Sequence, residues 1–213
     1  MGQAMRTMKY DRAANVASAV PFNLELNGSK LNFYRLDDGV MGGLSNTHQD
    51  ILLQSSKLQG FKLAFAGTIN TNGGGFTSIR SDLTSAFPVD SKGIKLKYRG
   101  DGKTYKVLLS DGVGGGPFSK SPSWQIDLPT EKRSDSDEAE ETTLFFQDFL
   151  PSFGGRSQMT SSERGNYHFI NSDIKQIGLM LSLQLSSGAP NPVETFGTGI
   201  FDFKLEVESI ELV

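Results

Sequence analysis

The adjacent aspartates Asp37 and Asp38 have side chains that could take part in catalysis or bind a metal. They open the run DDGVMGGLS at residues 37–45, which also holds three glycines. Carboxylates serve as general acids, nucleophiles and calcium ligands. Adjacent side chains on an extended chain point to opposite faces, so this pair cannot share one substrate. The run also lacks the alternating Asp/Asn pattern of a calcium loop, and we predict no metal site in it.

Nucleophilic catalysis has little support elsewhere in the chain. His48 and His168 are the only histidines, and therefore the only ordinary bases that could activate a nucleophile. They lie far apart without a metal-ligand spacing, and there is no Gly-x-Ser-x-Gly elbow or Gly-Lys-Ser/Thr phosphate loop. Cysteine is absent, which removes thiolate catalysis and cysteine-ligated metal. We predict that the protein is not an enzyme and holds no cofactor.

Composition and charge narrow the classes of partner. The 213 residues carry a net charge of −3 and a pI of about 5.4, whereas nucleic-acid phosphates attract basic surfaces. The lack of cysteine fits a reducing compartment. No apolar run reaches the roughly 20 residues that span a bilayer. We therefore expect protein partners rather than nucleic acid, and no direct membrane span.

Residues 1–20 are predicted to form a flexible or short helical N-terminal tail. Arg6, Lys9 and Arg12 lie among small residues with Asp11 as the only acid, a pattern similar to the end of an organelle transit peptide. A frayed N-terminal tail gives the same pattern, so both interpretations stay open.

Apolar residues recur with a period of two through most of the chain, which indicates half-buried β-strands. The alternation is clearest at residues 61–65, 94–99, 105–109, 179–185 and 200–213. The strand at 94–99 should bury its apolar residues and expose its three basic ones, and Asn27-Gly28 predicts a hairpin turn. Strands with one polar face favour antiparallel pairing. We predict an all-β fold, an antiparallel β-sandwich or jelly roll.

One β-sandwich domain is expected over residues 21–213, because a single domain of this size buries a sufficient core without disulfides. The segment EKRSDSDEAEE at residues 131–141 interrupts the strand pattern. Its composition is too acidic and polar to bury apolar area, so we predict a disordered insert there.

Five blocks of the sequence, in the same order, resemble the complex I intermediate-associated protein family. The run 37–45 is similar to the D-x-V-M-G-G-x-S signature of that family, and residues 99–105 are similar to its R-G-D-G-x-x-Y turn. The other blocks are residues 65–80, 146–156 and 177–180. The resemblance implies a jelly roll of the galactose-binding-domain-like type. It also implies an assembly factor for respiratory complex I, with relatives linked to photosystem biogenesis in plastids.

The glycines of the 37–45 run allow a sharp turn, and Asp37 or Asp38 can accept backbone N–H bonds that fix it. We expect Asp38 to pair with an arginine of the matched blocks: Arg80, Arg99 or Arg156. Met41 either plugs the end of the core or contacts a partner. The candidate partner-binding or loop-fixing residues are Asp37, Asp38, Val40, Met41, Gly42, Gly43, Ser45, Asn72, Arg80, Tyr98, Arg99, Asp101, Tyr105 and Arg156.

The leading hypothesis is a non-catalytic protein-interaction module, an assembly factor or chaperone for a membrane-bound electron-transfer complex. Its binding surface would include the 37–45 loop or the sheet face that bears Tyr98 and Tyr105. Its partners would be protein subunits or other assembly factors in an organelle, with the mitochondrion favoured over the plastid.

Two alternatives stay open. One is a plastid photosystem biogenesis or stability factor of the same family. The other is a carbohydrate-binding module, which needs exposed aromatic platforms on which sugar rings can stack. The candidates for such platforms are Trp124, Tyr34, Tyr98, Tyr105 and Tyr167.

Overall fold

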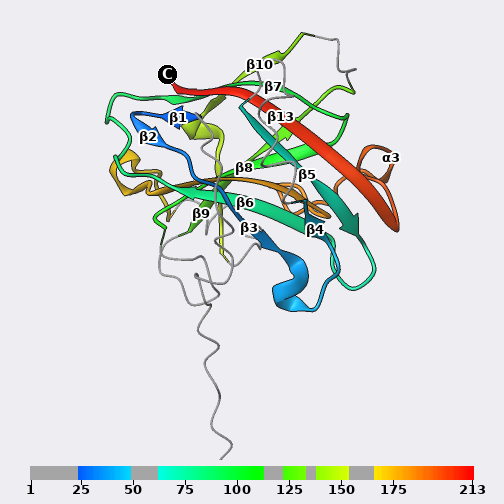
Figure 1. Ribbon diagram of the computed structural model, residues 1–213. Coiled ribbons are helices and arrows are strands. Elements are labelled where there is room, and N and C mark those ends of the chain that lie inside the picture. The colour runs from blue at the N-terminus through cyan, green and yellow to red at the C-terminus, as the bar shows by residue number, and fades with distance from the viewer. Residues whose placement is uncertain (1–23, 49–61, 113–121, 133–137, 154–165) are drawn as a thin grey trace, which may run out of the picture.

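The computed structural model describes residues 24–48, 62–112, 122–132, 138–153 and 166–213. Most regular elements in these ranges are antiparallel strands, which confirms the all-β prediction. The strands form two large sheets and one small hairpin (Figure 1). The tail predicted over residues 1–20 lies outside the described ranges.

A five-stranded sheet has the strand order β10-β7-β13-β5-β4. The long strand β13 is central and pairs with both β5 and β7. A register shift between Val207 and Ser209 lets Val207 and Ile210 both stay buried although they are three residues apart. The strands are β4 (Asn46–Thr47), β5 (Leu63–Asn70), β7 (Gly93–Arg99), β10 (Glu140–Phe145) and β13 (Ile200–Leu212).

A six-stranded sheet has the strand order β11-β9-β8-β12-β6-β3. Its strands are β3 (Tyr34–Asp37), β6 (Phe76–Asp82), β8 (Thr104–Ser110), β9 (Ser123–Pro129), β11 (Leu150–Ser152) and β12 (Gln176–Ser182). The helical elements are short: η2 (Asp38–Met41), η4 (Phe146–Asp148), η5 (Asn171–Asp173) and α3 (Val193–Phe196).

The small hairpin joins β1 (Glu25–Leu26) to β2 (Ser29–Lys30). Its turn residues Asn27 and Gly28 have φ of 50° and 73°. A two-residue hairpin turn with positive φ at both central residues matches the twist of the flanking strands, and Asn-Gly is the pair that adopts it most readily. The turn predicted from the Asn-Gly pair is therefore confirmed.

The core lies between the two large sheets. Phe65 of β5 meets Tyr105 of β8 edge to face, with ring centroids 6.1 Å apart, and Phe203 of β13 lies 4.9 Å from Phe65. Residues that alternate along the strands of both sheets are fully buried against this contact. Two antiparallel sheets packed face to face make the β-sandwich of jelly-roll type that the sequence predicts.

The prediction of a disordered insert over residues 131–141 is wrong at both ends, and at the N-terminal end Lys132 forms a β-bridge with Asp101. Residues 133–137 lie outside the described ranges, but Glu140 and Glu141 belong to β10 and pair with Tyr98 and Lys97 of β7. The carboxylate of Glu141 lies 3.8 Å from Lys95 Nζ. Because cross-strand lysines face Glu141, this acidic residue can stand in a regular strand.

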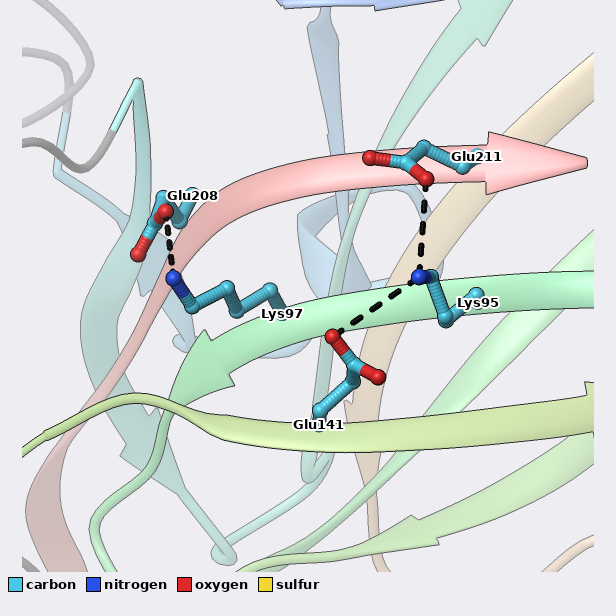
Figure 2. Close-up of polar contacts among 5 residues, drawn as sticks. All are labelled: Lys95, Lys97, Glu141, Glu208 and Glu211. Carbon is cyan, nitrogen blue, oxygen red and sulfur yellow. Dashed lines mark hydrogen bonds and ion pairs between the residues drawn. The ribbon is translucent and has the colours of Figure 1, made fainter.

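Ion pairs cross the outer face of the five-stranded sheet, as Figure 2 shows. Lys95 of β7 lies between Glu141 of β10 and Glu211 of β13, and Lys97 Nζ lies 2.7 Å from Glu208 Oε1. Each of these lysines faces a glutamate. This part of the face therefore does not present the single-sign field that attracts nucleic acid or anionic lipid.

Arg99 is buried, although the alternation of its strand predicts a position in solvent. Its Nη2 lies 2.7 Å from Glu206 Oε2, and Lys204 Nζ lies 2.8 Å from Glu206 Oε1. Arg99 and Glu206 are thus removed from water together on the outer side of the sheet. Alternation assigns a residue to a face but does not say how deeply that face is covered.

Replacing Glu206 by Gln should destabilise the protein by about 3 kcal/mol, because it removes the carboxylate that faces the buried Arg99 guanidinium. Urea unfolding followed by circular dichroism measures this free energy. The matched control is Glu208→Gln on the same strand, whose carboxylate pairs with the exposed Lys97 and should matter little. Equal losses of stability in the two variants would contradict a buried pair.

Candidate functional site

Two crossovers between the large sheets meet at one end of the sandwich. The chain leaves the six-stranded sheet at β3 and enters the five-stranded sheet at β4 through residues 38–45. It returns from β5 to β6 through residues 71–75. Helix α3 and the start of β13 lie at the same end (Figure 1). The DDGVMGGLS run therefore forms a corner of the sandwich.

The carboxylate of Asp38 joins the two crossovers. Its Oδ1 accepts the Ser45 N–H at 2.9 Å, and its Oδ2 accepts the N–H groups of Gly75 at 2.6 Å and Phe76 at 3.3 Å. Asp38 is only 1% exposed. The Ser45 hydroxyl extends the connection, because it accepts the Asn70 N–H at 3.0 Å. One buried anion thus fixes both loops through backbone donors.

Two glycines are required by the closeness of this carboxylate. A Cβ atom at Gly43 would collide with Asp38 Cγ, and a Cβ atom at Gly74 would collide with Asp38 Oδ2. Any side chain at either position would force the carboxylate away from its backbone donors. The glycines of both loops therefore serve the close approach of Asp38 as well as the turn itself.

The expected ion pair between Asp38 and an arginine is wrong within the described part of the chain. Arg99 instead pairs with Glu206, and Arg80 Nη1 donates to Gln176 Oε1 at 3.2 Å. Arg156 lies outside the described residues. Backbone N–H groups take the place of the guanidinium, and they leave no trace in the sequence because every residue except proline carries one.

Asp37 makes a second link between the edges of the two sheets. Its carboxylate accepts the Thr47 hydroxyl at 2.7 Å and the Thr47 N–H at 3.1 Å. Arg35 of β3 also donates to Asn46 Oδ1 of β4, at 3.1 Å. Burial raises the pKa of Asp37 above its ordinary 3.8, while the Thr47 bonds and the charge of Arg35 lower it by less.

Exposed aliphatic side chains surround this corner. Leu44 is 69% exposed and Ile200 is 71% exposed. Ile200 pairs with Asn70, the residue bonded to Ser45 beside Leu44. On the other side of Asp38, Leu183 donates its N–H to the Gly75 carbonyl. We call the exposed set the corner surface: Leu44, Leu183, Val193 and Ile200.

The sequence did not single out the corner surface beyond the 37–45 run. Residues 179–185 were expected to form one strand, but β12 ends at Ser182 and Leu183 lies exposed beyond it. Asn191, two residues before Val193, donates its N–H to the Leu183 carbonyl and brings that segment to the corner. The only sequence feature that could have pointed to Leu183 as a surface residue is its position as an apolar residue near the end of an alternating run.

Of the remaining candidate residues in these loops, some are exposed and others have side chains outside the described part of the structure. Gly42 and Asn72 are exposed, and Asn72 donates its N–H to Asn70 Oδ1. The side chains of Val40 and Met41 lie outside the described part of the structure, so neither role proposed for Met41 is tested. Both residues belong to the η2 turn, whose next residue, Gly42, has a φ of 88°.

Asp101 forms a second corner of the same kind, between β7 and β8. Its Oδ1 accepts the Tyr105 hydroxyl at 3.0 Å and the Lys103 N–H at 3.2 Å. Its Oδ2 accepts the Lys204 N–H of β13 at 3.0 Å. Burial, and then the nearby charge of Asp101, raise the pKa of Tyr105 well above 10.0.

Tyr98 and Tyr105 do not form a binding face, contrary to the expectation from the sequence. Both side chains are fully buried, and Tyr98 hydroxyl lies 3.1 Å from Thr142 Oγ1. Trp124 is also buried, where its ring meets Phe169. The aromatic platforms expected at these three residues are therefore wrong. Tyr34 and Tyr167, the other two candidates for platforms, are half-buried.

Groups for metal or acid–base chemistry do not gather in the described part of the chain. There, no cluster of three or more His, Asp or Glu residues could hold a metal ion. His48 Nε2 lies 3.0 Å from Thr68 Oγ1, and His168 is exposed. None of the helices described is long and apolar enough to cross a membrane.

A family model described as complex I intermediate-associated protein 30 (CIA30) matches residues 22–207. No curated protein matches the chain.

Among solved structures, the chain is similar to two carbohydrate-binding modules. One is the family 11 module from Clostridium thermocellum in complex with a beta-1,3-1,4-mixed-linked tetrasaccharide. It has 13% identity and a TM-score of 0.40, with 87% of this chain and 97% of that chain covered. The other is the family 11 module of the cellulosomal cellulase Lic26A-Cel5E of Clostridium thermocellum. It has 13% identity and a TM-score of 0.42, with 87% and 96% covered. At this level of similarity neither structure carries an argument about what the chain binds.

Replacing Asp38 by Ala should lower the free energy of unfolding by about 3 kcal/mol or more, because three backbone N–H groups lose their acceptor. Urea unfolding measures the loss. Asp90→Ala, at an exposed aspartate, is the control and should change stability by less than about 0.5 kcal/mol. Gly74→Ala should be less harmful in the Asp38→Ala background than in the wild type, and strict additivity of the two losses would contradict the contact.

The raised pKa of Asp37 predicts a pH dependence of stability. The folded state holds the proton more tightly than the unfolded state. The contribution of Asp37 is therefore fully present below pH 3.8 and is lost as pH rises through the folded-state pKa. Urea unfolding of wild type and Asp37→Asn over this window should show their stability difference falling as pH rises.

The isosteric variant Thr47→Val sharpens the test of Asp37. It removes the hydroxyl bond that lowers the pKa of Asp37, so the window should move to higher pH. A stability difference that rises with pH would mean that the hydrogen bonds outweigh burial.

Proposed function

The chain belongs to the complex I intermediate-associated protein 30 family, and we propose that it is a non-catalytic protein-interaction module acting in complex I assembly. In this proposal it binds protein intermediates of the membrane-bound complex through the corner surface and acts as an assembly factor or chaperone. The expected compartment is the mitochondrion, with a plastid photosystem factor of the same family as the alternative.

The observation that carries the proposal is the exposure of aliphatic side chains on a rigid frame. Leu44 lies next to Ser45, whose N–H is held by the buried Asp38 carboxylate. Ile200 is the first residue of β13, which pairs with β5 from Ile200 to Val207. Apolar side chains that are held in place before binding lose little conformational entropy when a partner covers them. Such residues are typical of the centre of a protein–protein interface.

The rim of the corner carries charges of both signs, since Lys103 Nζ donates to the Thr195 carbonyl beside Glu194, and a mixed rim favours a protein partner over nucleic acid or an anionic membrane. Glu194 and Asp202 are exposed beside Val193 and Ile200. Acidic residues at the rim repel phosphates, and an aliphatic centre with a polar rim suits a protein surface.

The test is affinity purification of the tagged full-length chain from its own cells after mild crosslinking. The double variant Leu44→Ser/Ile200→Ser should lower recovery of complex I membrane-arm subunits about tenfold or more, because two central apolar contacts are lost. Its melting temperature should stay near that of the wild type, since both side chains are exposed.

Val89→Ser is the matched control, because Val89 is also an exposed aliphatic residue but lies away from the corner surface. Its loop bonds through Lys92 to Val213, at the opposite end of β13 from Ile200. This variant should recover subunits as the wild type does. Equal recovery by the double variant would show that the corner surface is not the binding surface. Photosystem subunits in place of complex I subunits would establish the plastid alternative, and recovery of neither would refute the interaction module.

A further inference from the structure

A cluster of buried polar groups lies on the outer face of the six-stranded sheet, the face turned away from the core. Lys106 of β8 is 3% exposed and Gln125 of β9 is 2% exposed. The neighbouring residues Tyr105 and Val107 point to the core, so alternation places Lys106 on the opposite face. A lysine and a glutamine on the outer face of a sheet would ordinarily lie in water.

Several atoms near Lys106 have no hydrogen-bond partner. They are Gln125 Nε2, Ser186 Oγ and Asn191 Oδ1. These are three of the six buried side-chain atoms without a partner among the residues that the structure describes. Because such atoms are rare in folded proteins, their concentration in one place calls for an explanation.

The register of the sheet brings these groups together. Lys106 stands opposite Asp127, and Gln125 is two residues from Asp127 on the same face. The segment after β12 supplies the rest: Ser186 donates its N–H to Asp127 Oδ1 at 2.8 Å. Asn191 donates to the carbonyls of Thr104 at 3.0 Å and Ser182 at 3.1 Å. We call Lys106, Gln125, Asp127, Ser186 and Asn191 the Lys106 cluster.

The cluster meets solvent on one side. Asp127 is half-buried, and so are Thr104 and Met180, which flank Lys106 on the same face. Asp127 Oδ1 is committed to the Ser186 N–H, and Oδ2 accepts no hydrogen bond within the described part of the chain. Asp127 is therefore the member of the cluster that a ligand reaches first from solvent, and the buried donors and acceptors lie behind it.

Stability alone does not account for a lysine in this place. Burial lowers the pKa of Lys106 from 10.5 to about 8, although the charge of Asp127 raises it. The ammonium is thus held where its charge is disfavoured, without a hydrogen bond or ion pair within the described part of the chain. Buried groups kept at such a cost are frequent in binding and catalytic sites.

We propose that the Lys106 cluster binds a small uncharged polyhydroxylated ligand. A hydroxyl group both donates and accepts, so a ligand with adjacent hydroxyls satisfies the donors Lys106 and Gln125 and the acceptors Asp127 and Asn191 together. An anionic ligand would be repelled by Asp127 and a cationic ligand by Lys106. The site lies on a different sheet from the buried Arg99–Glu206 pair, and the proposal does not depend on the partner proposed for the corner surface.

The experiment uses three sugars of one ring size as probes: glucose, glucuronate and glucosamine. Titration of the full chain is followed by NMR through the side-chain resonances of Gln125 and the Lys106 ammonium. Glucose should bind with millimolar affinity and shift both resonances, while the anionic and cationic analogues should bind more weakly. The Lys106→Met variant should weaken glucose binding about tenfold or more, because a hydrogen bond from a charged donor is lost.

Lys95→Met is the matched control, because Lys95 lies on the outer face of the other sheet and pairs with glutamates there. It should bind glucose as the wild type does. Gln125→Leu gives a second variant with the same expected loss if Lys106→Met fails to fold. Absence of glucose binding, tighter binding of glucuronate, or glucose binding that survives both cluster variants would each overturn the proposal.

Discussion

The carboxylate of Asp38 is the interaction on which the corner of this sandwich depends. Two crossovers between the sheets pass within bonding distance of it, and it holds both through backbone N–H groups. The approach is so close that neither Gly43 nor Gly74 leaves room for a side chain. Asp101 repeats the device at the β7–β8 crossover, where it ties Tyr105 of one sheet to the backbone of Lys204 in the other. The buried Asp38 and the half-buried Asp101 thus set how the edges of the sheets meet at these two crossovers.

This arrangement separates two roles within one loop. The aspartates, glycines and serine of the DDGVMGGLS run make the frame, because their groups point into the corner and are used there. Leu44, within the run, points outward, and the other members of the corner surface lie outside it. A sequence signature of this kind therefore identifies the clamp that shapes the corner surface, but it includes only Leu44 of the four residues of that surface.

The strands were predictable because their apolar residues alternate, and the Asn27-Gly28 turn was predictable because few other pairs accept its φ angles. Alternation could not show that Arg99 is buried with Glu206 on an outer face, since burial there depends on a partner from a distant strand. The same limit applies to Tyr98 and Tyr105, whose phenol groups find partners inside the protein. Asp37 or Asp38 was expected to accept backbone N–H bonds, and both do, but the expected pairing of Asp38 with an arginine was wrong.

The outer faces of the two sheets treat charge in opposite ways, and this contrast bears on function. On the five-stranded sheet, exposed lysines pair with glutamates across neighbouring strands (Figure 2). The buried Arg99 on that face also has a partner of opposite charge, Glu206. On the six-stranded sheet, Lys106 is withdrawn from water without an ion pair among the residues described, beside amide and hydroxyl groups that also lack partners. Folding gains nothing from the second arrangement, because each uncompensated group raises the free energy of the native state. A ligand would add most to stability on this face, because the face holds hydrogen-bonding groups that have no partner. Binding there should therefore raise the melting temperature as well as change the spectra of the Lys106 cluster.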